Sequence, residues 1–192
     1  MGALATKTGV TADEYLAWER EEPQKHEFHD GEVFAMAGGS PRHNVLSASF
    51  GAELRAALRG KGCHVFSSDQ RVVALSGRRF LYPDAVATCG ELRFEPGTTD
   101  VLANPTVIVE VLSPSTEAYD RGGKWEAYQR IASLTDYVLV TQTSAGLEHF
   151  AREPGGSWRY RLLGSGEVLT LSNGSTIAVD AVFEGAFDVA AG

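Results

Sequence analysis

The chain of 192 residues has few cysteines, no long apolar run and no excess of basic residues, and each lack excludes a class of protein. Its two cysteines, Cys63 and Cys89, are too few for a disulfide scaffold and are not clustered as in a zinc site, so we expect reduced thiols in a cytoplasmic protein. No apolar run approaches the roughly 18 residues of a membrane-spanning helix, which excludes a membrane protein. With 17 Lys and Arg against 25 Asp and Glu, the net charge of −8 has the wrong sign for non-specific binding along phosphate backbones. A nucleic-acid partner therefore requires a local site.

The apolar content, 43% of the residues, is enough for one packed domain spanning residues 1–192. Helical spacing and capping residues predict helices that begin at Thr11, at Ser40-Pro41 and after the loop Pro114–Thr116. Period-two and β-branched runs predict strands over 25–30, 32–37, 63–66, 71–75, 82–88, 106–112 and 137–141, and turn residues predict hairpins between 146 and 187. The expected fold class is therefore mixed α/β (α+β), with C-terminal β-hairpins.

Glu110 is the most informative residue, because it lies inside the apolar strand predicted over 106–112. An unpaired ionised carboxylate there would cost several kcal/mol at least, so Glu110 needs a cation, a hydrogen-bond network or a proton. Strand alternation places it on one face with Ile108 and Leu112. The alternative is a glutamate near the strand end that pairs with a surface arginine.

Asp84 lies in another predicted strand, 26 residues before Glu110. A Pro-Asp step is most often only a turn. Here the spacing is long enough for a strand, a surface excursion and a neighbouring strand, which would bring the two acids together.

Lys124 lies on the apolar stripe of a predicted helix, because apolar residues follow it at i+3, i+4 and i+7. Either its stem covers the core while its amine stays in water, or the amine meets the acids at the strand ends. The Gly122-Gly123 pair disfavours a helix interior, so we expect the regular helix to begin there, with Asp120 as a candidate N-cap.

Two further residues are open to more than one interpretation. His43, at a helix start, either caps the helix on the surface or approaches the same site or a phosphate. Tyr128 is expected in the core with a hydrogen-bonded hydroxyl.

Three stretches carry a family resemblance. They are Lys25-His26-Glu27-Phe28-His29-Asp30-Gly31-Glu32, the step Tyr82-Pro83-Asp84, and Val109-Glu110-Val111-Leu112-Ser113-Pro114-Ser115-Thr116 followed by Asp120, Lys124 and Tyr128. With the order of elements, they resemble the Uma-two family of restriction-endonuclease-like proteins, within the PD-(D/E)XK nuclease superfamily, over about residues 11–187. The resemblance implies a mixed central sheet flanked by helices, with the active site at the strand ends.

The resemblance also implies site residues and partners. Asp84 and Glu110 match the metal-ligating acids, and Glu27 matches an N-terminal acid often found near them. The superfamily lysine position after the second acid is Leu112 here, and Lys124 matches the position to which that lysine moves in similar branches. DNA is the implied nucleic-acid partner, and a homodimer is implied because small nucleases of this fold often pair to cut both strands.

These residue types suit metal-assisted hydrolysis. Carboxylates are hard ligands for Mg²⁺, or for Mn²⁺, and the backbone carbonyl of Val111 and a phosphate oxygen could complete the octahedron. The ion acidifies a bound water, and an ammonium from Lys124 would orient that water or stabilise charge on the phosphate. The sequence thus predicts a Mg²⁺-dependent endonuclease that hydrolyses DNA with Asp84, Glu110, Lys124 and Glu27 in its site.

Two alternatives stay open at this point. The acidic balance favours a catalytically silent nuclease-like module that binds nucleic acid or a protein partner. The second alternative is a structural subunit in which the acids and Lys124 form a buried network of ion pairs, and it would show no metal dependence.

Overall fold

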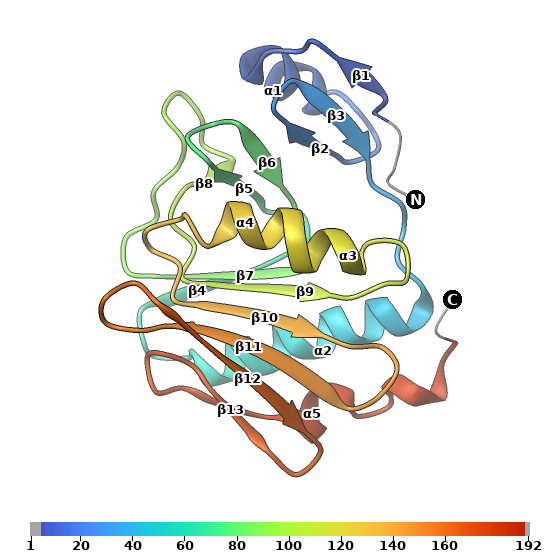
Figure 1. The fold of residues 1–192 in the computed structure, drawn as a ribbon, viewed down its shortest axis with the longest axis vertical. Helices are drawn as coiled ribbons and strands as arrows, with labels where there is room; N and C mark the ends of the chain where they lie inside the picture. Colours follow the sequence, from blue (N-terminus) through green and yellow to red (C-terminus); the bar gives the residue numbers. More distant parts are fainter. Residues whose placement is uncertain (1–4, 191–192) are drawn as a thin grey trace.

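The computed structural model describes residues 5–190, which form two six-stranded sheets and a short β-ladder (Figure 1). The N-terminal sheet has the strand order β1-β3-β2-β6-β5-β8, and the central sheet has the order β12-β11-β10-β9-β7-β4. The N-terminal sheet consists of β1 (Lys7–Thr8), β3 (Glu32–Ala35), β2 (His26–His29), β6 (Arg79–Leu81), β5 (Arg71–Ala74) and β8 (Val101–Leu102). The central sheet consists of β12 (Trp158–Gly164), β11 (Gly146–Arg152), β10 (Asp136–Val140), β9 (Val107–Val111), β7 (Ala85–Cys89) and β4 (Cys63–Ser67), and the ladder of β13 (Val168–Thr170) and β14 (Thr176–Ala178).

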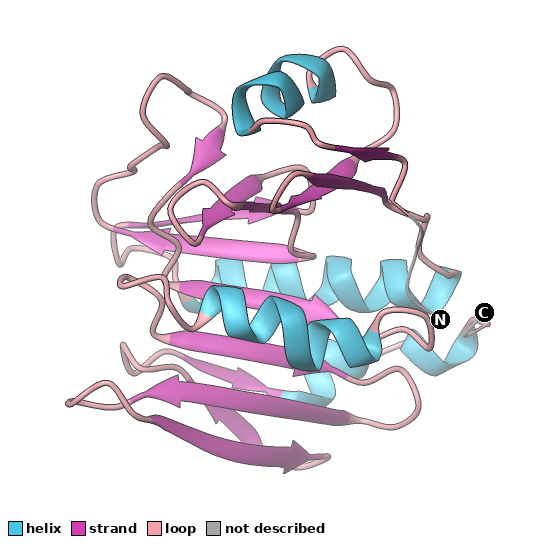
Figure 2. Cartoon of the chain, turned by 45° about the horizontal axis from the view of Figure 1, so that its top comes forward, coloured by secondary structure: helices cyan, strands magenta, loops and turns pink. Residues whose placement is uncertain are grey.

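Helices cover both faces of the central sheet, as Figures 1 and 2 show. One face packs on α2 (Pro41–Ala57) and α5 (Val179–Phe183), and the other packs on the helical segment that contains α3 (Glu117–Tyr119) and α4 (Trp125–Tyr128). The remaining helices are α1 (Ala12–Glu19), against the N-terminal sheet, and a 3₁₀ turn at Ala186–Asp188. Among the described residues, no helix has both the length and the apolar character needed to cross a membrane.

Alternation along β9 decides which side chains meet which helix. Val107 and Val109 pack into the cluster that includes α2, whereas Ile108 and Leu112 pack into the cluster that includes Tyr128 of α4. Glu110 therefore faces α4, on the face predicted for it.

The strand register places Asp84 beside the end of β9. β7 pairs with β9 antiparallel, with Ala85 opposite Val109, while β10 pairs with β9 parallel. The central sheet is thus mixed, as predicted, and Asp84, directly before β7, lies next to Glu110 across the two strands.

Local signals explain the elements that were predicted correctly. The side chain of Thr11 caps α1 in a capping box with Glu14, and Ser40 caps α2 with Pro41 in its first turn. Asp30 and Gly31 adopt the positive φ angles that a tight hairpin between β2 and β3 requires.

The prediction of two reduced thiols is wrong. Cys63 and Cys89 face each other across β4 and β7, and they form a disulfide. Sequence spacing could not show this contact, because it depends on the register of two strands that lie 26 residues apart.

Candidate active site

The side chains predicted from the sequence line one cleft of about 490 Å³, between the two sheets' strand ends and α3. Glu27 comes from β2, Asp84 from the residue before β7, Glu110 from β9 and Lys124 from the helical segment after β9. Val111, the predicted backbone ligand, also lines the cleft. The fold therefore brings all five predicted residues together.

Lys124 lies at the centre of this arrangement. Its Nζ is 3.0 Å from Glu110 Oε1, 3.3 Å from Glu27 Oε1 and 3.4 Å from Asp120 Oδ1, and the residue is only 6% exposed. Burial lowers the pKa of Lys124, but the carboxylates of Glu110 and Glu27 raise it more, so its pKa lies well above the usual range. The amine is therefore a buried ammonium that holds acids from two sheets, and the interpretation as a solvent-reaching lysine is wrong.

A π-helical turn at Asp120–Lys124 makes this contact possible. It continues without a break from α3 into α4, so the prediction that a regular helix begins at Gly122-Gly123 with Asp120 as N-cap is wrong. Asp120 is instead 2% exposed and points its Oδ1 at Lys124. Wider π turns inside α-helices are common at functional sites, and this one places an acid and the ammonium on one face.

The two glycines of this turn are not equivalent, which gives a matched test. A Cβ at Gly123 would lie 2.7 Å from the Tyr119 ring, whereas one at Gly122 would meet nothing within 4 Å. We expect G123A to lower the free energy of unfolding by about 1–3 kcal/mol through overpacking. We expect G122A to raise it by up to about 1 kcal/mol through helix propensity. Urea unfolding of both variants checks this, and equal effects would contradict the role given to Tyr119.

Asp84 is held by a strand backbone and a histidine. Its Oδ2 accepts a hydrogen bond of 2.7 Å from the Val111 N–H and lies 3.3 Å from His43 Nε2. Burial lowers the pKa of His43, but its hydrogen bond to Asp84 and the charge of that carboxylate raise it above the usual value. The other oxygen, Oδ1, accepts no hydrogen bond from the part of the chain described and belongs to a side chain that lines the cleft.

Glu27 joins the N-terminal sheet to the site. Its Oε1 accepts a hydrogen bond from the Tyr82 N–H, and its Oε2 lies 3.7 Å from His29 Nε2 on the same strand face. Burial raises the pKa of Glu27, but the Lys124 ammonium and the contact with His29 lower it more, so the net direction is downward. Glu27 is therefore an ionised partner that fixes Lys124.

Glu110 has the opposite balance. Its Oε1 accepts hydrogen bonds of 3.0 Å from both Lys124 Nζ and the Tyr128 hydroxyl. Burial raises the pKa of Glu110, Lys124 opposes this, and the charges of Asp120, Asp84 and Glu27 raise it further, so its pKa lies well above the usual value. Burial and the neighbouring acids therefore favour the protonated form of Glu110 more than in a solvent-exposed glutamate.

Two observations make the residues a fitting site for a divalent cation. Among residues 5–190, Asp84 Oδ1 accepts no hydrogen bond and the buried Asp120 Oδ1 has only its 3.4 Å ion pair with Lys124, and acids exceed cations in the cleft. Within the same range, no three His, Cys, Asp or Glu side chains form a cage of their own. Mg²⁺ does not require one, because it is usually bound by one or two carboxylates, substrate phosphate and several waters.

Three residues of the cleft were not assigned to it from the sequence. His43 contacts Asp84 instead of serving as a surface cap, Asp120 contacts Lys124, and the Tyr119 hydroxyl contacts the His29 ring. Two of them carried a signal: the helix start left open an approach of His43 to the same site, and Asp120 lies four residues before Lys124, one helical turn away. Tyr128, expected as a core tyrosine with a bonded hydroxyl, makes that bond to Glu110.

Comparison with known proteins gives consistent results. A family model described as "Uma2: Putative restriction endonuclease" matches residues 12–187, which confirms the resemblance inferred from the motifs. A relative in Synechocystis sp., named uncharacterized protein slr1290, is 35% identical over 177 residues, which cover 92% of each chain. A second, uncharacterized protein sll1609 of the same organism, is 31% identical over 158 residues, covering 82% of this chain and 89% of the relative.

A crystal structure has a similar fold. It is described as a putative nuclease belonging to DUF820 from Anabaena variabilis, and it matches with a TM-score of 0.74 over 92% of this chain and 99% of the other. The sequence identity is 12%, so the likeness concerns the fold alone. It confirms the predicted nuclease-like fold class.

Proposed function

We propose, from the premise that this chain belongs to the Uma2 family of restriction-endonuclease-like proteins, that it is a Mg²⁺-dependent nuclease acting on DNA. The observation that carries the proposal is the buried Lys124 ammonium at the end of β9, held by Glu27, Glu110 and Asp120 beside Asp84. Burying so many charges costs free energy that a purely structural domain would avoid with apolar residues.

The residues have separable roles in this proposal. Asp84, Glu110 and the Val111 carbonyl would hold the cation, which when bound polarises the phosphate and acidifies a water. His43 and the Val111 N–H fix the Asp84 carboxylate, and Tyr128 fixes Glu110. These contacts leave Asp84 Oδ1 free for the ion.

Lys124 has an electrostatic role. Its ammonium is set in place before substrate arrives, because Glu27, Glu110 and Asp120 fix it. A preorganised cation in a site of low water content stabilises charge that develops on a phosphate in the transition state. Glu27 acts through Lys124 and is a positioning residue.

A cleavage assay tests the proposed function. We expect the purified chain to nick or cut plasmid and oligonucleotide DNA with Mg²⁺ or Mn²⁺ and to be inactive in chelator. Ca²⁺ should bind without supporting turnover, because its loose coordination serves a metal-activated water poorly. If the chain binds metal and leaves every DNA and RNA form intact, the function is instead that of a silent nuclease-like binding module.

The remaining expectations from the sequence stay predictions. They are a single domain, a cytoplasmic location and a homodimer whose two sites would cut both strands. Size-exclusion chromatography with light scattering tests the last of these.

A further inference from the structure

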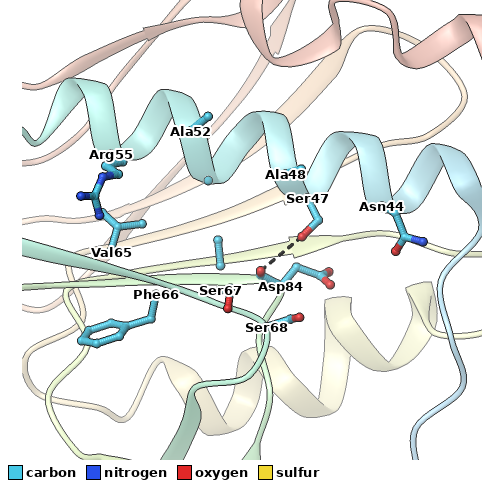
Figure 3. A pocket seen from close by; sticks show the side chains of 12 residues that line it. Asn44, Ser47, Ala48, Ala52, Arg55, Val65, Phe66, Ser67, Ser68 and Asp84 are labelled. Atoms are coloured by element: carbon cyan, nitrogen blue, oxygen red, sulfur yellow. Dashed lines mark hydrogen bonds between the residues drawn. The ribbon is translucent and has the colours of Figure 1, made fainter.

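A second hollow of about 390 Å³ opens beside the candidate active site (Figure 3). It runs between α2 and the strands β4 and β7, and Figure 3 shows Asp84 near one end and Arg55 at the other. Asn44, Ser47, Ser68 and Asp84 line both this groove and the cleft. The two hollows therefore meet at a proposed metal ligand.

The walls of the groove differ in charge from the rest of the chain. Asp84 is the one acid among its lining residues, although the chain as a whole carries a net charge of −8. Arg55 is exposed and forms no salt bridge or hydrogen bond with any residue of the range 5–190. An arginine without a carboxylate partner in an acidic protein is suited to a phosphate.

On the helix side of the groove, small residues leave room for a bound backbone to approach α2 closely. Ala48, Gly51 and Ala52 line it, and a Cβ placed on Gly51 would meet nothing within 4 Å. On the sheet side, Val65 and the serines of β4 and the following turn complete the wall, while the Phe66 ring packs toward the opposite face of the sheet (Figure 3). Proteins that hold one nucleic-acid strand let its backbone run along a groove that carries positive charge.

We propose that this groove holds one strand of the nucleic-acid substrate, with a phosphate on Arg55 and the strand leading to Asp84. The Ser47 hydroxyl donates a hydrogen bond to the Asp84 carbonyl, which fixes the start of the track on α2. From Ser47 to Arg55 the helix rises by about 12 Å, a length of roughly three nucleotides of a B-form strand. The proposal rests on the proposed function and deepens it by giving the path along which one strand of DNA reaches Asp84.

Charge removal gives the first test. Binding of a fluorescent single-stranded oligonucleotide is measured by anisotropy in Ca²⁺, for R55A and for the matched control R59A. Arg59 is also exposed, lies in the turn just after the end of α2 at Ala57, and does not line the groove. We expect R55A to weaken binding about tenfold and to reduce the salt slope by about 0.7, the value for one phosphate contact on a single strand. R59A should bind like the wild type, and equal weakening in both variants would overturn the proposal.

Filling the groove gives a second test that leaves the charge unchanged. We expect G51L to weaken strand binding about tenfold because its side chain occupies the track, while G51A, which adds only a Cβ in open space, should have a small effect. Melting temperatures of all four variants show whether each is folded. Wild-type binding by G51L would overturn the proposal.

These measurements separate the two proposals, because binding in Ca²⁺ does not require cleavage. If the chain cuts DNA with Mg²⁺ while R55A and R59A bind alike, the groove proposal fails and the proposed function stands. If binding depends on Arg55 and nothing is cut, the nuclease function fails and the groove remains as a binding site. If the wild-type chain binds no single strand at all, the groove proposal is wrong.

Discussion

Asp84→Asn is expected to reduce the affinity for Mg²⁺ by at least about a hundredfold and to abolish measurable DNA cleavage. Mutating the outer partners of a metal ligand already costs about 10–100-fold in metal affinity or activity, so neutralising the ligand itself should cost more. The asparagine keeps an oxygen for the Val111 N–H, which Asp84 Oδ2 accepts at 2.7 Å. The variant should therefore fold normally and report the loss of charge.

The matched control for this change is Asp69→Asn. The Asp69 side chain is 83% exposed and pairs with Lys25, and an exposed pair of this kind contributes little to stability. Calorimetric titration with Mg²⁺ and the cleavage rate should be unchanged in this control. Melting temperature supplies a third reading, because Mg²⁺ should stabilise the wild type and the control but not Asp84→Asn. Equal stabilisation of all three by Mg²⁺ would remove Asp84 from the metal site.

The sequence predicted the residues of the site better than it predicted how the strands and helices around them are arranged. Glu110 was identified because an acid inside an apolar strand needs a partner, and it is buried with Lys124 and Tyr128 as partners. Asp84 was identified from the length of chain between two strands, and β7 and β9 do pair. The burial of Glu110 and the meeting of the two acids followed from local periodicity and chain length, which a sequence displays directly, whereas their match to metal ligands came from the family resemblance.

What the sequence did not show depends on register between distant segments. The sequence left two positions open for His43, and the structure decides for the contact with Asp84, 41 residues away; Cys63 meets Cys89 through the pairing of β4 with β7. Alternation tells which residues share a face of one strand, but it does not tell which strand lies beside it. The division into two sheets was missed for the same reason, since β6 connects β2 to β5 by pairing alone.

The short helix α5 and the π turn were missed for different reasons. α5 follows β14 directly and has no side-chain cap, so nothing marks its start. The glycines of the π turn predicted the start of a helix by propensity, whereas the buried ion pair of Asp120 with Lys124 favours a continuous helical segment. Tertiary contacts overrode propensity at this position.

Lys124→Met is expected to lower the rate of DNA cleavage by roughly a hundredfold or more, as loss of one preorganised electrostatic group does. Methionine retains the volume of the stem and removes the charge. Metal binding should survive, because an ammonium donates hydrogen bonds and cannot ligate a cation. It is expected to become tighter, since a positive charge next to Glu110 and Asp120 is removed.

The same variant should lose stability. Glu27, Glu110 and Asp120 would remain buried without their common cation, and breaking a buried ion pair on one side costs about 3–5 kcal/mol. A lysine with its amine in water would instead give a slightly more stable protein on this change. The direction of the change in free energy of unfolding, measured in chelator, therefore distinguishes the buried ammonium from a surface amine.

A second substitution separates the structural role of Lys124 from its role in catalysis. In the double variant Lys124→Met with Glu110→Gln, an amide replaces the Glu110 carboxyl, which accepts hydrogen bonds from both Lys124 and Tyr128. One acid that would be left without its cation is therefore removed together with that cation. Stability should recover in part, because removing both partners of a buried pair costs less than removing one. Activity should not recover, since the proposed metal ligand and the ammonium are both lost. Recovery of cleavage together with stability would show that Lys124 only holds the fold.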